Sequence, residues 1–212
     1  MPELYIITGS NGAGKSSVGA YYLPVAIREK YTVFDGDKLY MLKQKKLWAS
    51  GITAIKEAKK IALAYVTETF DKLVDEALSL SETFVYEGHF TNDSTWDIPK
   101  KFKKHGYQVN MIFLGVNNPD ISELRVIDRV KVGGHFVSRN VVEDNFFGNL
   151  EKLNKYFGIL DNLDIIDTSE TEHILLATFS KGEVIFCLPL SKMPQWFSLQ
   201  LPLLVEKIKS FL

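Results

Sequence analysis

The chain has 212 residues, of which 46% are hydrophobic and 24% charged, so it can bury a substantial core and global disorder is excluded. Its formal net charge of −1 argues against a broadly basic nucleic-acid-binding protein. The single cysteine, Cys187, excludes an intrachain disulfide and a multi-cysteine zinc site. Only four of the 25 basic residues are arginines, and Arg125, Arg129 and Arg139 fall within one stretch of fifteen residues.

Length and the ends of the chain set the expected class of protein. The N-terminus has no charged segment followed by a long apolar run, so we expect no signal peptide. No stretch approaches the ~20 apolar residues that cross a bilayer. The length fits one α/β domain over residues 1–212 better than two domains. We therefore expect a cytoplasmic protein, with neither nucleic acid nor a membrane among its partners.

Short apolar runs alternate with helical patterns over most of the chain. The predicted strands are Leu4–Thr8, Thr32–Phe34, Thr83–Tyr86, Val109–Leu114 and Leu163–Ile166. A helix-compatible run follows at Ser16–Leu23, and an apolar stripe predicts a helix within Ile55–Leu78. The members of that stripe are Ile61, Tyr65, Phe70, Leu73 and Ala77. The alternation predicts an α/β fold with a parallel sheet flanked by helices.

The pattern changes in the last part of the chain. Ile174–Phe179 and Val184–Leu188 flank Ser180-Lys181-Gly182, which predicts an antiparallel hairpin. Trp196–Leu212 reads as one amphipathic closing helix. Residues 172–212 are therefore expected to add a hairpin and a helix to the domain. The helical region at 119–156 is expected to form a lid.

The most informative motif follows the first predicted strand. It reads Gly9-Ser10-Asn11-Gly12-Ala13-Gly14-Lys15-Ser16-Ser17 and matches G-x-x-x-x-G-K-[ST]. Glycines let the backbone N–H groups approach phosphate oxygens closely, and the following helix adds its N-terminal dipole. Lys15 can reach the β- and γ-phosphates, and the Ser16 hydroxyl can ligate Mg²⁺. The motif predicts binding of a nucleoside triphosphate with Mg²⁺, and ATP is favoured because no N-K-x-D guanine signature is evident.

Carboxylates follow the second and third predicted strands. Asp35-Gly36-Asp37 comes where ligands bind in open α/β sheets, so Asp37 can accept a proton from a hydroxyl or hold Mg²⁺. A turn with a helix N-cap explains the same residues equally well. Glu87 resembles a Walker B acid that holds Mg²⁺ or orients the substrate, or it is an ordinary strand-end carboxylate. His89 is expected in a structural place or at the substrate rim.

Arg125 and Arg129 lie four residues apart and therefore share a helix face. Gly133-Gly134-His135 is expected to end that helix, and Ser138 to cap the next one, Arg139–Tyr156. Arginine supplies planar, permanently charged donors for the charge that develops in phosphoryl transfer. The segment predicts a pair of helices that closes over the nucleotide. The alternative is a solvated helix face with surface ion pairs.

Several motifs together resemble the zeta-toxin family, and most closely its branch of zeta-toxin-like P-loop kinases. The resemblance covers most of residues 3–169. It rests on the sequence GSNGAGKSS, the D-x-D before a helix, the Y-E-G strand end, Gly106-Tyr107, the segment RVIDRVKVGGHFV and Asp167-Thr168-Ser169. The segment R-V-x-x-R-V-x-x-G-G-H is the most specific of these.

The resemblance implies transfer of a phosphoryl group from ATP to a hydroxyl of a sugar nucleotide, because characterised zeta toxins phosphorylate UDP-N-acetylglucosamine. By position, Asp37 would be the general base, Glu87 would lie on the substrate side, and Arg125 or Arg129 would clamp the nucleotide. A toxin role would imply an antitoxin protein, which the sequence does not identify. In this branch, a basic cluster often follows G-G-H; here residues 143–149 read EDNFFGN instead.

Two functions outside the leading hypothesis of a small-molecule kinase stay open at this point. The first is a nucleotide-gated regulator or a weak ATPase, which would hydrolyse ATP without an acceptor. The second is an ATP-binding module without turnover, which the missing basic cluster motivates.

Overall fold

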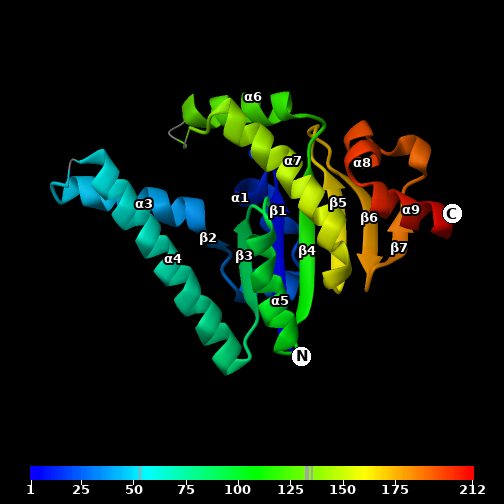
Figure 1. The fold of residues 1–212 in the computed structure, drawn as a ribbon, viewed down its shortest axis with the longest axis horizontal. Helices are drawn as coiled ribbons and strands as arrows, with labels where there is room; N and C mark the ends of the chain where they lie inside the picture. Colours follow the sequence, from blue (N-terminus) through cyan, green and yellow to red (C-terminus); the bar gives the residue numbers. More distant parts are fainter. Residues whose placement is uncertain (53, 132–133, 135) are drawn as a thin grey trace.

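The computed structural model describes residues 1–52, 54–131, 134 and 136–212. Its centre is a seven-stranded sheet in the order β2-β3-β1-β4-β5-β6-β7 (Figure 1). The strands are β1 (Glu3–Gly9), β2 (Phe34–Asp35), β3 (Phe84–Gly88), β4 (Gln108–Gly115), β5 (Asn162–Asp167), β6 (Ile174–Ser180) and β7 (Glu183–Cys187). The first five pair in parallel, whereas β6 and β7 are antiparallel. The predicted parallel sheet with a C-terminal hairpin is therefore confirmed.

Helices pack on both faces of this sheet. They are α1 (Lys15–Val18), α2 (Val25–Lys30), α3 (Gly36–Ala49), α4 (Ile55–Leu80), α5 (Asp97–Lys104), α6 (Pro119–Lys131), α7 (Arg139–Tyr156), α8 (Gln195–Gln200) and α9 (Pro202–Phe211). Short 3-10 helices span Gly19–Tyr22, Asp93–Trp96, Phe157–Ile159 and Leu190–Lys192. The apolar strands and the inner faces of these helices form one large buried cluster. No described helix is long and apolar enough to cross a membrane.

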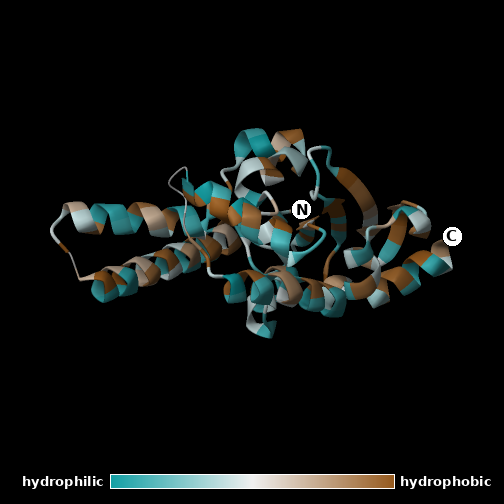
Figure 2. Ribbon diagram, turned by 90° about the horizontal axis from the view of Figure 1, so that it is seen from above, coloured by the Kyte–Doolittle hydropathy of each residue, from teal (hydrophilic) through white to brown (hydrophobic). Residues whose placement is uncertain are grey.

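The helices α3 and α4 leave the sheet together and project as a long arm (Figures 1 and 2). They pack on each other through a small apolar cluster of their own, formed by Leu47, Ala58 and Ala62. Because α4 has 26 residues, at 1.5 Å per residue it is about 39 Å long. Part of the predicted stripe therefore lies on the arm rather than on the core, and Tyr65 is an exposed member of it.

Two predicted elements near the N-terminus differ from the structure in extent. In the segment Thr32–Phe34 only Phe34 joins the sheet, together with Asp35, because β2 is an edge strand that pairs with β3 alone. The predicted helix Ser16–Leu23 ends at Val18 and continues as a 3-10 turn. Pro24 favours an extended residue before it, and Leu23 accordingly has φ −67° and ψ 146°.

The expectation of one closing helix over Trp196–Leu212 is wrong. Two helices, α8 and α9, meet at Leu201 and Pro202. Proline has no N–H for the helical ladder and restricts the residue before it, so the first helix ends and Pro202 begins the second. Trp196 and Phe197 of α8 are buried, which fixes the C-terminal segment to the sheet.

The helix ends around residues 131–139 were also predicted from the sequence. Ser138 occupies the N-cap position of α7, but its side chain makes no capping hydrogen bond. The preceding helix, α6, ends at Lys131, and the Gly134 N–H donates to the Arg129 carbonyl at 2.9 Å. Gly133 and His135 of the predicted break lie outside the described residues.

Gly115 at the end of β4 provides a test of how α8 is attached. A Cβ at this position would lie 2.2 Å from two ring atoms of Trp196. The Gly115→Ala variant is expected to lower the free energy of unfolding by about 1–3 kcal/mol, because the indole has to move out of a packed core. Urea denaturation measures this loss. Gly158→Ala is the matched control, since open space surrounds Gly158; equal stability of the two variants would contradict the packing argument.

Candidate active site

The phosphate loop lies between the carboxyl end of β1 and the first residue of α1. β1 is flanked by β3 and β4, so the loop emerges near the middle of the sheet. Gly12 and Gly14 have φ values of +71° and +95°, a region that residues with a Cβ rarely adopt. Lys15 then begins α1, and the helix N-terminus faces the same space as the loop. The structure therefore has the strand, loop and helix that the motif predicts.

The loop is packed tightly against α6. A Cβ on Gly12 would lie 2.9 Å from both the Arg125 Cβ and the Ser122 carbonyl oxygen. The hydroxyls of Ser10 and Ser122 are 3.0 Å apart and share a hydrogen bond. The conformation of the loop therefore depends on α6, which lies more than 100 residues further along the chain.

Lys15 is held at the loop by two backbone carbonyls. Its ammonium donates to Gly9 at 3.0 Å and to Ser10 at 2.9 Å. Burial lowers the pKa of Lys15 to about 8, while the nearby carboxylates of Glu87 and Asp37 act in the opposite direction. A charged ammonium in this place is costly without anions, so the site favours binding of a phosphate there.

Glu87 lies in β3, next to the loop. The Ser16 hydroxyl donates a hydrogen bond to its carboxylate. Burial raises the pKa of Glu87 to about 7, although the Ser16 bond and the charge of Lys15 lower it. Asp35 is the register partner of Glu87 in β2, and its charge also raises the pKa.

The two aspartates after β2 have different places. Asp35 caps α3, where its carboxylate accepts a hydrogen bond from the Lys38 N–H at 2.8 Å. Asp37 lies in the first turn of α3 and lines the cavity that contains the phosphate loop. The N-cap interpretation is therefore confirmed for Asp35, and a chemical role for Asp37 stays a prediction.

A cavity of about 890 Å³ opens over the phosphate loop. Besides loop residues, its lining includes Asp37, Glu87, Arg125, Asp128, Arg129 and the segment after β5 from Ser169 to Thr171. No cluster of three or more His, Cys, Asp or Glu side chains that could hold a metal occurs among the described residues. Ser16 and Glu87 form a pair of oxygen donors of the kind that holds Mg²⁺ together with nucleotide phosphates.

Arg125 connects three segments of the site. Its guanidinium donates to the Gly12 carbonyl at 3.2 Å and to the carbonyls of Thr168 and Ser169 at 2.8 Å each. The predicted Arg125 is thus at the cavity, but its described hydrogen bonds go to the backbone. Arg129 lies one turn further along α6 and lines the same cavity. The predicted Asp167-Thr168-Ser169 element meets the loop too, because the Thr168 hydroxyl donates to the Ala13 carbonyl at 2.9 Å.

Arg139 ties α6 to α7 rather than reaching the loop. It pairs with Asp120 and Glu123 of α6 and with Glu143 of α7, each at 2.6 Å. The two predicted lid helices are therefore joined at their outer surface.

The sequence analysis missed Asn145 and Asn149 on α7. The Asn145 amide donates to the Asn11 side chain at 2.7 Å. Asn149 is buried; it accepts from the Phe90 N–H at 2.6 Å and donates to the His89 ring at Nδ1, 3.3 Å away. The sequence signal that could have found them is their spacing of four residues, which places both on one helix face in the segment that lacks the basic cluster.

His89 lies behind Lys15. Its Nδ1 faces the Asn149 amide at 3.3 Å, and its Nε2 lies 3.5 Å from the Lys15 ammonium. Burial and the charge of Lys15 hold the pKa of His89 well below its ordinary value. His89 is not among the described residues that line the cavity. This location supports a structural role for His89, and its contact with a substrate stays a prediction.

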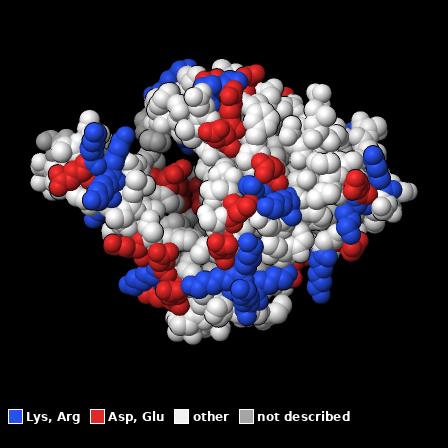
Figure 3. Space-filling view, in the orientation of Figure 1, with Lys and Arg blue, Asp and Glu red and all other residues white. Residues whose placement is uncertain are grey.

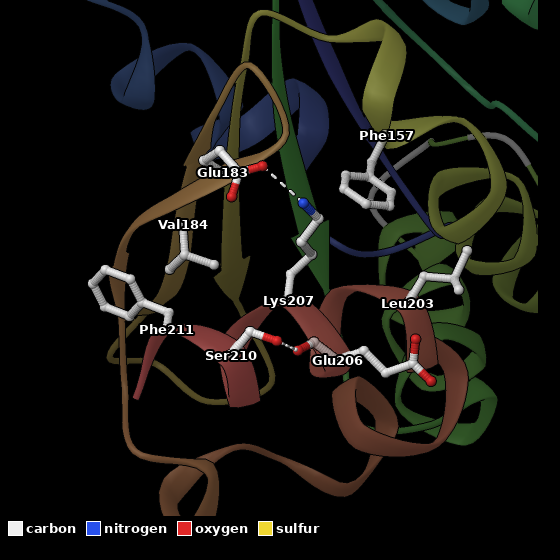
Figure 4. A pocket seen from close by; sticks show the side chains of 8 residues that line it. All are labelled: Phe157, Glu183, Val184, Leu203, Glu206, Lys207, Ser210 and Phe211. Carbon is white, nitrogen blue, oxygen red and sulfur yellow. Dashed lines mark hydrogen bonds and ion pairs between the residues drawn. The ribbon is translucent and has the colours of Figure 1, made fainter.

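A second hollow lies at the other end of the molecule, between β7 and α9 (Figure 4). Its volume is about 530 Å³, and Phe157, Val184, Leu203 and Phe211 form its apolar part. Lys207 lines it but is paired with Glu183 at 2.8 Å. This hollow has no phosphate loop, and at the N-terminus of α9 the Leu203 N–H already donates to the Asn154 side chain at 2.9 Å, so the cavity over the loop is the candidate active site.

The Arg125→Lys variant tests the connecting role of the guanidinium. Lysine keeps the charge but cannot reproduce a planar fork to three carbonyls, so the variant is expected to lose about 1–3 kcal/mol of stability and to bind ATP more weakly. Urea denaturation and calorimetric titration with ATP measure the two effects. Arg28→Lys, on the surface over Tyr21, is the control; a change of similar size in this control would contradict the role.

The Glu87→Gln variant tests the raised pKa. The native state holds this proton more tightly than the unfolded chain, whose pKa is the ordinary value, so stability falls as the pH rises. The wild-type Tm is expected to fall from about pH 5 to about pH 7, and the variant is expected to fall less over the same interval. Scanning calorimetry in EDTA, without nucleotide, gives both curves. Parallel curves would show that burial does not perturb Glu87.

Solved structures similar to this fold include a two-protein complex and a toxin–antitoxin system. AvrRxo1-ORF1, in its complex with AvrRxo1-ORF2 and sulphate ions, has a TM-score of 0.71 and 14% identity over 95% of this chain and 64% of its own. The same complex with ATP has a TM-score of 0.67 and 15% identity over 87% and 60%. The PezAT toxin–antitoxin system of Streptococcus pneumoniae has a TM-score of 0.58 and 16% identity over 100% of this chain and 86% of its own. At these identities the likeness shows the fold.

Sequence comparison adds one relative and one family. An uncharacterized protein of Haemophilus influenzae is 32% identical over 60 residues, which are 28% of this chain and 43% of that protein. The chain thus aligns with less than half of this relative and with 64% of AvrRxo1-ORF1. The family described as Zeta toxin matches residues 1–176. Because this match includes the phosphate loop, Asp37, Glu87 and both cavity arginines, the resemblance read from the motifs is confirmed, and the chain belongs to the Zeta toxin family.

Proposed function

We propose that this chain is an ATP-dependent kinase that transfers the γ-phosphoryl group to a hydroxyl of a small molecule. A sugar nucleotide such as UDP-N-acetylglucosamine is the first acceptor to test, because the family resemblance implies it. The observation that carries the proposal is the joint lining of one cavity by the phosphate loop, Asp37 and Glu87. Membership of the Zeta toxin family supports it.

The residues take the following parts in this proposal. Backbone N–H groups of the loop and the Lys15 ammonium bind the β- and γ-phosphates. Asp37 accepts the proton of the attacking hydroxyl, the part that the family resemblance implies for it; it lines the cavity, whereas Asp35 is engaged as the cap of α3. Arg129 stabilises charge on the transferring group, whereas Arg125 holds the loop and the segment after β5 in place.

Magnesium fits the donor pair of Ser16 and Glu87, and when bound it would neutralise phosphate charge. For this the Glu87 carboxyl has to give up its proton, and the Ser16 hydroxyl has to turn from the carboxylate to the metal. Both groups are already side by side. Closure of the joined helices α6 and α7 would exclude water from the cavity. This is the role expected of the predicted lid at 119–156.

A weak ATPase or ATP-binding regulator is the second candidate. One observation favours it: α7 presents Asn145 and Asn149 to the loop and His89, where the related branch often has a basic cluster. Such a protein would consume ATP without an acceptor or would bind it without turnover.

The proposal also includes a protein partner. The similar structures of AvrRxo1-ORF1 and of the PezAT system are complexes with a second protein. We infer by analogy that an antitoxin-like protein controls this chain. One domain over residues 1–212 and a cytoplasmic location complete the proposed description.

The Asp37→Asn variant tests the kinase mechanism. It is expected to lower kcat by about 10²- to 10⁴-fold, because the hydroxyl loses its proton acceptor, while ATP affinity stays close to that of the wild type. ADP release coupled to a spectroscopic assay, with UDP-N-acetylglucosamine and other hydroxyl compounds as acceptors, gives the rates. Asp35→Asn is the matched control, since asparagine caps a helix as well as aspartate.

Two outcomes would contradict the proposal. Unchanged turnover in Asp37→Asn would remove Asp37 from the mechanism. ATP consumption that no acceptor accelerates, or no consumption at all, would favour the second candidate.

A further inference from the structure

The arm of α3 and α4 ends in an uncharged tip. Residues 47–55 read Leu-Trp-Ala-Ser-Gly-Ile-Thr-Ala-Ile and contain no charged side chain. Trp48 on α3 and Ile55 on α4 flank the turn and are 50% and 63% exposed. Trp48 and Ile55 therefore present apolar surface at the same end of the arm, where a partner can cover both.

Lysines surround this tip on both helices. The lysine collar consists of Lys43, Lys45 and Lys46 before the tip and Lys56, Lys59 and Lys60 after it. At 1.5 Å per helical residue, all six lie within about 8 Å of the tip along the helix axes. Figure 3 shows the blue side chains gathered on the outer part of the arm.

The charge of the collar is not neutralised within the protein. Residues 38–63 contain seven lysines and the single acid Glu57, a net charge of +6, so the remaining residues carry −7. Outside residues 38–63, at least eight of fourteen lysines form ion pairs with carboxylates; one of them is Lys72, further along α4, which pairs with Glu76. Among the described residues of 38–63, no lysine forms an ion pair; Lys43 lies over the Tyr65 ring instead, 4.1 Å from its centre.

We infer that the arm docks on an anionic lipid bilayer, with the tip among the headgroups and the lysine collar against their phosphates. Exposed apolar side chains at a tip with lysines a few ångströms behind match the depth of the bilayer interface, into which apolar faces sink about 5–10 Å. Tryptophan favours this interfacial level, and each lysine near an anionic surface adds attraction. The contact is peripheral and differs from membrane spanning.

A nucleic acid fits the arm less well. The arm has no arginine, which makes the bidentate contacts to phosphates and bases. Its two packed helices present a projecting end rather than a groove that tracks a strand (Figure 2). An acidic protein would explain the charge but does not by itself explain an uncharged tip ringed by lysines.

Docking would also place the active site. α3 begins at Gly36, beside Asp37, and ends at Ala49 near the tip, so its 14 residues span about 21 Å. The cavity would therefore face the bilayer from a distance of about 20 Å. This inference does not depend on the proposed reaction, because it rests on the arm alone.

Trp48 makes the inference directly measurable. The other two tryptophans, Trp96 and Trp196, are 0% and 3% exposed, so a change of environment on docking is reported by Trp48. Vesicles of phosphatidylcholine with 30% phosphatidylserine are expected to carry the full-length protein upward in flotation and to shift its tryptophan emission to the blue. Pure phosphatidylcholine vesicles are expected to do neither, and raised salt to reverse both effects.

Variants separate the two parts of the surface. Replacing Lys45, Lys46, Lys59 and Lys60 by Gln is expected to weaken docking by about fivefold per lysine, or several hundredfold in all. Ile55→Asp is expected to abolish the blue shift. The matched controls are Leu199→Asp, whose side chain is also 63% exposed, and a fourfold Gln variant of Lys30, Lys104, Lys192 and Lys209. Unchanged ATP affinity and Tm verify that every variant is folded.

Three results would overturn the inference. The first is no flotation with anionic vesicles at low salt. The second is equal docking of the collar variant and its lysine control. The third is that a single-stranded oligonucleotide or polyglutamate binds more tightly than vesicles do and changes the Trp48 emission. The partner of the arm would then be a nucleic acid or an acidic protein.

Discussion

The packing of α6 on the phosphate loop is the contact on which the rest of the site depends. Gly12 leaves just enough room for the Arg125 Cβ and the Ser122 carbonyl, and the Arg125 guanidinium then binds Gly12, Thr168 and Ser169 at once. One side chain thereby fixes the loop, the segment after β5 and α6 relative to one another. Any closure of α6 over a nucleotide has to keep or replace these three hydrogen bonds, so α6 is the element that links nucleotide binding to the shape of the cavity.

Burial in the cavity determines the pKa shifts of its charged side chains. Lys15 has a lowered pKa, Glu87 has a raised one, and His89 is held neutral, each chiefly because the charged form is poorly solvated there. A cation beside a partly protonated acid is a poorly stabilised arrangement. Bound phosphates would favour the charged lysine, and a bound divalent cation would favour the ionised glutamate. An anion and a divalent cation bound together would therefore stabilise the charged forms of both Lys15 and Glu87.

Local sequence patterns predicted most of the sheet and the residues at its carboxyl edge. Short apolar runs and the glycine-rich loop are signals carried by neighbouring residues, and β1, β4 and β5 form where those signals lie. What failed depended on distant contacts: the two-residue β2 has one neighbour strand, and Tyr65 is exposed because the arm leaves the core. Asn149 was missed because its four partners come from two other segments, β1 and the residues after β3, and from α7 itself. The division between Asp35 as a cap and Asp37 at the cavity also required the path of the backbone.

The net charge is near zero, but positive and negative side chains are concentrated in different parts of the molecule. Arginines and lysines also occupy different kinds of position. Arg125 and Arg139 hold segments of the site together through fixed forks to carbonyls and carboxylates, which a lysine cannot reproduce. The six lysines of the collar form no ion pair among the described residues, and they surround the uncharged tip about 20 Å from the cavity along α3. Arginines therefore make the contacts that require a fixed geometry, whereas lysines supply the positive charge around the tip. A strong field on a projecting arm can orient the protein against a negatively charged surface without disturbing the cavity, because at 0.15 M salt the field decays over about 8 Å.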